Sequence, residues 1–216
     1  DSAAVAANIL DAESMSVWKD VDGILNADPK VFPDAVQIAE LNYLDTIELA
    51  YSGAQIIHPK TIKPLQNKNI PLYVRPFGDK RKPGTVIRRM SAPIEVPILI
   101  LKKDQVLLTI RSRDFSFVLE EKFAAIFSLL ERYRIKVNLV HNSAVNLSLC
   151  VDNSWHIDEA IQALRNEEFD VMKVENMELL TIRGYNGDLM ERYASGPEVF
   201  LLQRTQSTAR IVRKNR

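Results

Sequence analysis

The chain lacks several features that would assign it to a class directly. Cys150 is the only cysteine among 216 residues, so no internal disulfide can form, and a reducing cytoplasm is the compartment we expect. No apolar run reaches the roughly 18 residues that a membrane-spanning helix needs. The 28 basic and 28 acidic residues cancel, which removes the electrostatic reason to expect nucleic acid or an anionic membrane as a partner. With 46% hydrophobic residues, the chain can still bury a core.

What the sequence does contain is a short apolar strand followed by a polar loop, between Val17 and Pro33. In open α/β sheets, ligands bind at loops that leave the carboxyl ends of strands. Asp20 comes where this strand would end, and Lys19 and Lys30 place a cation on either side of it. A carboxylate could bind hydroxyls or a metal-bound water, and the two cations could bind phosphate. The alternative is an ordinary turn with solvated lysines.

The amino-acid sequence of this loop resembles a motif of a known protein family. WKDVDGILNADPK is similar to the nucleotide-binding segment of aspartate kinases, usually T-D-V-x-G-[VI]-Y-T-x-D-P-R. The resemblance continues, in the family's order and spacing, through ELNYLDTIELAYSGAQIIHPKTIKPLQNKNIPLYVRPF and PGTVI. It is close over residues 1–90 and looser over the rest, which resembles an amino-acid-binding ACT regulatory region. The resemblance implies a cytoplasmic, allosteric enzyme of lysine and threonine biosynthesis.

The family's nucleotide contacts map onto six positions of this chain. Only Asp20 keeps the usual residue. At Lys30 the family's Arg is replaced by Lys, which retains the charge without the bidentate fork. Leu25 replaces a Tyr that would stack on the adenine, Lys19 replaces a Thr, and Gln55 replaces a Lys. The implied ATP-binding residues are Lys19, Asp20, Leu25, Lys30, Gln55 and Ile56.

The first residues also bear on the substrate site. Family members carry Gly-Ser-Asp-[TY]-[ST]-Ala, whose Asp contacts the substrate, and the opening Asp1-Ser2-Ala3-Ala4 is one residue short of that pattern. Asp1 is therefore either the substrate-contacting residue or a helix cap. No Lys-Phe-Gly-Gly-Thr-Ser motif occurs, so we expect the carboxyl-terminal part of a longer enzyme, and an isolated chain without kinase activity.

The first 90 residues should alternate helices and strands. Asn42 is a good N-cap for a helix that Gly53 ends, and Pro59 suits the first position of another helix. His58, directly before it, is more typical of a cap than of a catalytic residue. The expected elements are a helix at 1–12, a strand at 15–21, a helix at 42–52, a helix starting at 58–59 and a strand at 70–74.

After a proline-containing linker, the pattern changes to βαββαβ, the ferredoxin-like order. Cys150 lies in an alternating apolar strand and should be a small core residue. The expected strands are 105–111, 136–140, 145–151 and 169–174, with helices at 119–133 and 156–166 and further strands at 179–183, 199–204 and 209–213.

We therefore predict an α/β fold: the carboxyl-terminal part of an amino-acid-kinase α/β/α sandwich, followed by a ferredoxin-like (βαββαβ) ACT region. The predicted domains are the nucleotide side of the catalytic domain at 1–90, a linker at 91–97, an ACT domain at 98–177 and a reduced second ACT unit at 178–216.

The ACT resemblance implies an effector site. The family segment N-[IV]-x-[VI]-[DN]-[LM]-[IV] corresponds to RIKVNLV, with small polar residues following it. The implied effector residues are Val137, Asn138, Asn142 and Ser143. The loop DFSFVLEEKF lacks the family's small Gly, which leaves the effector open between lysine and threonine. A homodimer through ACT domains is expected, since pairing hides sheet edges.

The resemblance implies transfer of the γ-phosphate of ATP, with Mg²⁺, to the side-chain carboxylate of L-aspartate, giving 4-phospho-L-aspartate. No metal ligands can be assigned from the sequence. The alternative is an amino-acid-sensing dimeric regulatory module without catalysis. A third possibility is another amino-acid kinase, such as a glutamate or uridylate kinase, and the appended ACT pattern argues against it.

Overall fold

The computed structural model describes residues 2–55, 57–90, 93–114 and 120–215. The chain divides into two compact units. Unit 1 comprises Asp1–Leu101 and Thr181–Tyr185, and unit 2 comprises Lys102–Leu180 and Asn186–Arg216. None of the described helices is long and apolar enough to cross a membrane.

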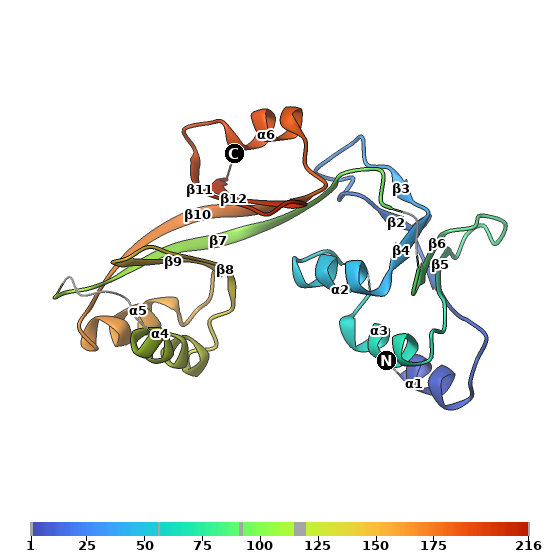
Figure 1. The fold of residues 1–216 in the computed structure, drawn as a ribbon, viewed down its shortest axis with the longest axis horizontal. Helices are drawn as coiled ribbons and strands as arrows, with labels where there is room; N and C mark the ends of the chain where they lie inside the picture. Colours follow the sequence, from blue (N-terminus) through green and yellow to red (C-terminus); the bar gives the residue numbers. More distant parts are fainter. Residues whose placement is uncertain (1, 56, 91–92, 115–119, 216) are drawn as a thin grey trace. The chain divides into compact units, whose positions relative to one another are not determined.

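Unit 1 is built on a four-stranded sheet in the order β1-β5-β6-β4 (Figure 1). β1 and β5 are parallel, as are β4 and β6, whereas β5 and β6 are antiparallel. The elements are α1 (Ser2–Ile9), β1 (Met15–Lys19), β2 (Ile24–Leu25), β3 (Gln37–Ile38), β4 (Glu40–Asn42), α2 (Tyr43–Tyr51), α3 (Pro59–Asn67), β5 (Leu72–Pro76) and β6 (Thr85–Arg88).

The three helices of unit 1 supply one side of its core. Ala4 of α1, Leu49 of α2 and Ile62 of α3 are buried in the same cluster as the sheet residues Leu72 and Ile87. Residues of β5 alternate between buried and half-buried, which is the period of two expected for a strand with one covered face. The sheet therefore presents its apolar face to the helices.

The helix ends of unit 1 follow the predicted capping chemistry. The Asn42 side chain accepts a hydrogen bond from the Asp45 backbone N–H at 2.7 Å. His58 Nδ1 accepts from the Lys60 backbone N–H at 3.1 Å, with Pro59 in the first turn. Gly53 has φ of 113°, in the region that favours glycine. The capping roles of Asn42 and His58 are therefore confirmed.

Unit 2 contains a six-stranded sheet in the order β11-β12-β10-β7-β9-β8. The elements are β7 (Ile98–Ser112), α4 (Glu120–Arg132), β8 (Val137–Asn142), β9 (Asn146–Asp152), α5 (Ile157–Asn166), β10 (Phe169–Arg183), α6 (Gly187–Ala194), β11 (Val199–Arg204) and β12 (Thr208–Lys214). The βαββαβ order is present from β7 to β10. The apolar residues of α4 and α5, such as Ile126 and Leu164, share one core with Leu108 and Leu149 of the sheet.

Cys150 of β9 is fully buried, as predicted for a core residue. Burial raises the pKa of its thiol to about 12, so the side chain is uncharged at neutral pH. Its Sγ lies 3.5 Å from Gln105 Oε1. Cys150 is therefore a packing residue and not an activated nucleophile.

One prediction about unit 2 was wrong, and one helix was not predicted. The strands expected at 169–174 and 179–183 are one continuous strand, β10. Met177 and Glu178, between the two expected strands, are buried, and Arg213 neutralises Glu178. The sequence analysis also missed helix α6, whose N-cap Asn186 accepts from the Leu189 backbone N–H at 2.9 Å.

Candidate functional site

A cavity of about 410 Å³ lies in unit 1 at the carboxyl end of β1. Its walls come from three stretches that are distant in sequence, together with Val74 of β5. The first runs from Lys19 to Lys30, the second contains Gly53, Ala54 and Gln55 after α2, and the third is Ile98–Leu101 at the start of β7. One wall is largely apolar, because it contains Ile24, Leu25 and the β7 residues.

Four of the six predicted nucleotide residues line this cavity. They are Lys19, Leu25, Lys30 and Gln55. Asp20 directly follows Lys19 but is not among the lining residues, and Ile56 lies outside the described residues, as does the predicted substrate residue Asp1. The structure thus brings together side chains that are up to 36 positions apart, from Lys19 to Gln55.

The shape of the loop depends on a close approach at Gly23, which has φ of 155°. A Cβ at this position would lie 2.6 Å from Gln37 Nε2 and 2.8 Å from Thr85 Oγ1. The buried Thr85 hydroxyl accepts from the Ile24 backbone N–H at 2.8 Å and donates to the Ile38 carbonyl at 2.5 Å. Only glycine allows this approach, which seats the loop against β6.

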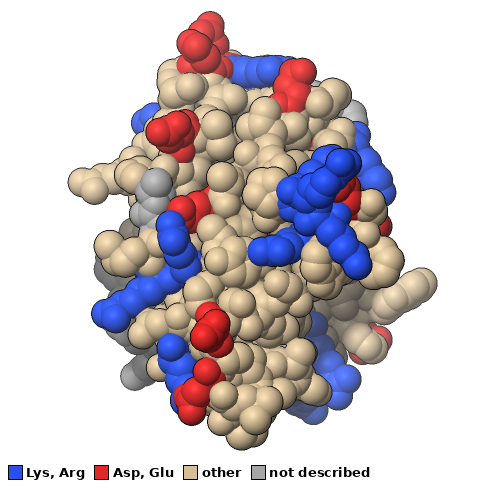
Figure 2. All heavy atoms as spheres, turned by 90° about the vertical axis from the view of Figure 1, so that its right-hand side faces the viewer, with Lys and Arg blue, Asp and Glu red and all other residues tan. Residues whose placement is uncertain are grey.

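Lys30 is placed by a second turn at the far end of the loop. The Asp28 carboxylate accepts from the Lys30 backbone N–H at 2.9 Å, and the Asp28 carbonyl accepts from Phe32 N–H at 2.8 Å. Asp22, on the same loop, pairs with Lys82 at 2.7 Å. On the face shown in Figure 2, basic and acidic side chains form separate small groups, in keeping with the balanced composition.

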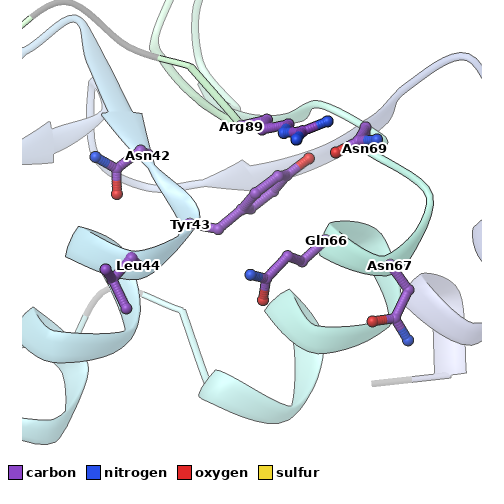
Figure 3. Close-up of a pocket in the computed structure, with 7 residues that line it drawn as sticks. All are labelled: Asn42, Tyr43, Leu44, Gln66, Asn67, Asn69 and Arg89. Carbon is purple, nitrogen blue, oxygen red and sulfur yellow. The ribbon is translucent and has the colours of Figure 1, made fainter.

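A second cavity of unit 1, about 450 Å³, has a different character (Figure 3). Its polar lining is mainly carboxamides with one guanidinium, and none of the predicted site residues contributes to it. The Tyr43 hydroxyl donates to the Ile70 carbonyl at 2.6 Å, and burial raises the pKa of Tyr43. The lining residues are Asn42, Tyr43, Leu44, Gln66, Asn67, Asn69 and Arg89.

The predicted effector residues lie along one edge of the sheet of unit 2. Val137, Asn138 and Asn142 belong to β8, and Ser143 follows it. Ser143 Oγ accepts from the Asn146 backbone N–H at 3.2 Å, within the turn to β9. The loop before α4, also predicted to contact the effector, includes residues 115–119, which are outside the described residues.

The Asn138 side chain belongs to a polar network that the sequence analysis missed. Asn138 Nδ2 donates to Gln105 Oε1 at 2.8 Å and to Asp152 Oδ1 at 2.6 Å. Lys102 Nζ donates to Asn138 Oδ1 at 2.7 Å and lies 3.3 Å from Asp152 Oδ1. These partners lie 14 to 36 positions away in the sequence, on β9 and on β7, so no local sequence signal indicated them.

The network shifts the pKa values of its charged members. Burial raises the pKa of Asp152, but the hydrogen bonds from Gln105 and Asn138 and the charge of Lys102 outweigh it, so the net shift is downward. Burial lowers the pKa of Lys102, and the nearby Asp152 opposes this only in part. Asn138 thus stabilises a carboxylate within the sheet.

No group of three or more His, Cys, Asp or Glu side chains in the described part of the chain could hold a metal ion.

Comparisons with known proteins agree with the resemblance read from the sequence. Residues 1–76 match the amino acid kinase family. The chain is 31% identical over 207 residues to lysine-sensitive aspartokinase 3 of Escherichia coli, covering 92% of this chain and 45% of that protein. It is 36% identical over 152 residues to the chloroplastic aspartokinase 3 of Arabidopsis thaliana, covering 67% of this chain and 26% of that protein.

Solved structures give the same result. E. coli aspartokinase III in complex with lysine and aspartate superimposes with a TM-score of 0.75 and 26% identity, over 97% of this chain and 50% of that one. The aspartate kinase of Clostridium acetobutylicum gives a TM-score of 0.85 at 18% identity and shares the fold. The fold class and the resemblance to part of an aspartate kinase are confirmed. The chain spans about half the length of these proteins, or less.

Proposed function

We propose that this chain is the nucleotide-binding and regulatory part of an aspartate kinase, which transfers the γ-phosphoryl group of ATP to the side-chain carboxylate of L-aspartate and forms 4-phospho-L-aspartate. The observation that carries the proposal is the shared cavity of Lys19, Leu25, Lys30 and Gln55. These positions were identified from the resemblance alone, and the two separate stretches of the chain that contain them both line this cavity. Phosphoryl transfer needs mainly positioning and neutralisation of charge, which such a cavity can supply.

The roles follow from the chemistry of the lining. Lys19 and Lys30 neutralise phosphate oxygens, and the apolar wall of Ile24, Leu25 and the start of β7 covers the base. Asp20, next to Lys19 in the chain, accepts hydrogen bonds from a hydroxyl or a metal-bound water. Mg²⁺ enters with ATP, held mostly by phosphate oxygens and water. Asp1 remains the predicted contact of the aspartate substrate.

The test is the substitution of Lys30 in an enzyme that contains this chain. We expect Lys30→Ala to raise KM for ATP about tenfold while changing KM for aspartate little, because one charged phosphate contact is lost. The difference should shrink at high salt, which screens the contact. Asp20→Ala should affect ATP in the same direction. Lys80→Ala is the matched control, since Lys80 is exposed and does not line the cavity.

An unchanged KM for ATP in both Lys30→Ala and Asp20→Ala would contradict the assignment. Activity lost equally in Lys80→Ala would indicate a general loss of basic charge instead of a specific contact.

The regulatory part of the proposal concerns β8. Val137, Asn138, Asn142 and Ser143 would bind lysine or threonine, and β8, as an edge strand of its sheet, would pair with a second copy in a homodimer. The E. coli aspartokinase III structure contains lysine, which supports an amino-acid effector. A regulatory module without catalysis is the second candidate, supported by the complete βαββαβ order of unit 2.

Melting curves test the effector. A ligand that binds only the folded chain at a hundredfold excess over its Kd stabilises it by about 2.7 kcal/mol. We expect millimolar lysine or threonine, but not methionine, to raise Tm, and Asn138→Ala to abolish the increase. If none of the three amino acids changes Tm, unit 2 is a dimerisation unit without a sensor role.

A further inference from the structure

Asn26 makes an unusual set of contacts at the first cavity. Its Nδ2 donates to the Pro97 carbonyl at 2.8 Å, and its Oδ1 accepts from the Val36 backbone N–H at 2.7 Å. Its own backbone N–H donates to the Val36 carbonyl at 2.9 Å, and its carbonyl accepts from Leu99 N–H at 2.8 Å. Asn26 therefore uses both ends of its carboxamide and both of its backbone groups to join three stretches of unit 1.

Two of these stretches line the cavity. Asn26 lies between Leu25 and Lys30 on the loop, and its partners Pro97 and Leu99 flank the first residue of β7, Ile98. Val36 continues the short ladder in which Ile24 pairs with Ile38 and Leu25 with Gln37. The start of β7 and the cationic loop are thus joined by hydrogen bonds at Asn26.

We infer that Asn26 is a positioning residue for the nucleotide: it sets the separation between the β7 wall, which covers the base, and the loop that presents Lys30 to the phosphates. This inference rests on the proposed function of the cavity. Asn26 acts through backbone groups at 97–99 and 36 and has no need to contact the reacting atoms. A carboxamide suits this role because it donates at one end and accepts at the other.

The aspartate-kinase pattern has Thr at this position, where this chain has Asn. A Thr hydroxyl is shorter and lies on a branched side chain, so it can reach one of the two partners well but not both. The pair of side-chain bonds that Asn26 makes, to Pro97 and to Val36, is therefore one that a Thr at this position would not make in full.

The experiment compares Asn26→Leu with Asn8→Leu in the full 216-residue chain. Asn8 is the control for the hydrogen bond, because its Nδ2 also donates to a proline carbonyl, that of Pro64, at 2.6 Å. Asn26 is among the residues that line the first cavity and Asn8 is not, so the exchange of the Leu99 amide is the readout that reports positioning. Both changes replace a carboxamide by an uncharged side chain of similar size. ATP is the probe, with Kd measured by titration, and hydrogen exchange of the Leu99 amide is followed without nucleotide.

We expect Asn26→Leu to weaken ATP binding by about tenfold to a hundredfold, the cost of misplacing binding groups by an ångström or so. The Leu99 amide should exchange faster in this variant. Asn8→Leu should bind ATP with a Kd within about twofold of the parent's, even if its Tm falls as much as that of Asn26→Leu. Asn26→Thr should be intermediate in ATP affinity, and it replaces Asn26→Leu if the latter does not fold.

Asn26→Leu or Asn26→Thr that binds ATP like the parent overturns the inference, while ATP binding by the parent leaves the proposed function standing. A parent chain that binds no ATP overturns both. Equal losses of affinity in Asn26→Leu and Asn8→Leu would show a general loss of stability, and would also overturn the positioning role.

Discussion

The two units treat their predicted polar residues in opposite ways. In unit 1, Lys19, Lys30 and Gln55 line a cavity open to a ligand. In unit 2, the Asn138 side chain bonds to Gln105 and Lys102 of β7 and to Asp152 of β9. The motif spacing indicated a binding position in both cases. It did not indicate whether the side chain at that position forms its hydrogen bonds with other residues of the protein.

The difference has a physical cause in where each set of residues lies. The residues of unit 1 are in loops at the end of a strand, where backbone turns away from its neighbours and leaves room. Asn138 lies within a strand beside the buried Gln105, and buried polar groups must find partners nearby. An effector at Asn138 would therefore compete with Lys102 and Asp152.

The largest effect should come from the buried ion pair of unit 2. Arg213 Nε lies 2.7 Å from Glu178 Oε1, and the two side chains are 7% and 4% exposed. Glu178→Ala leaves the guanidinium buried without its counter-charge, which should reduce the free energy of unfolding by ~3–5 kcal/mol. Chemical denaturation measures the loss, and hydrogen exchange should locate it in β10 and β12.

The matched control is the double variant Glu178→Leu, Arg213→Met. Because apolar side chains of similar volume have no charge to desolvate, the double variant should recover most of the lost stability. A double variant no more stable than Glu178→Ala would show that packing around Tyr193, over which Arg213 stacks at 5.4 Å, matters more than charge.

This pair also explains what the sequence could and could not predict. The helix caps at Asn42 and His58 could be predicted, because each bonds to a residue two or three positions away in the sequence. The βαββαβ order was readable because each element carries its own periodicity. The continuity of β10 was not, because the partner that makes Glu178 acceptable in a strand is 35 positions away. The same holds for Asn26, whose bond to Pro97 spans 71 positions.

A smaller effect, confined to unit 1, should follow from Gly84→Ala. Gly84 has φ of +72°, and a Cβ there would lie 2.1 Å from the Val74 carbonyl oxygen. The backbone of β5 would have to move, at a cost of ~3 kcal/mol. Denaturation should show the loss, and exchange should accelerate in β5 and β6 but not in β10. Gly78→Ala is the control, since nothing lies within 4 Å of its Cβ, and it should change stability by less than ~0.5 kcal/mol. Similar losses in the two variants would mean that the close approach at Gly84 is unimportant.

The smallest effect concerns how the polar network around Asp152 in unit 2 makes the stability of the chain depend on pH. The folded state holds the pKa of Asp152 below its usual range, because hydrogen bonds from Gln105 and Asn138 and the charge of Lys102 outweigh burial. A lowered carboxylate pKa contributes stability that is complete above the unfolded pKa of about 3.9 and is lost as pH falls through the lower folded value. The Asp152 side chain is 37% exposed, so solvent screening limits the contribution to about 1 kcal/mol or less.

Urea unfolding of the parent and of Asp152→Asn measures this contribution. The free energies of unfolding of the two proteins should differ most at pH 7 and converge as the pH falls below about 4. A difference that grows on acidification would mean that Asp152 is protonated more easily in the folded chain, and that the network destabilises its carboxylate.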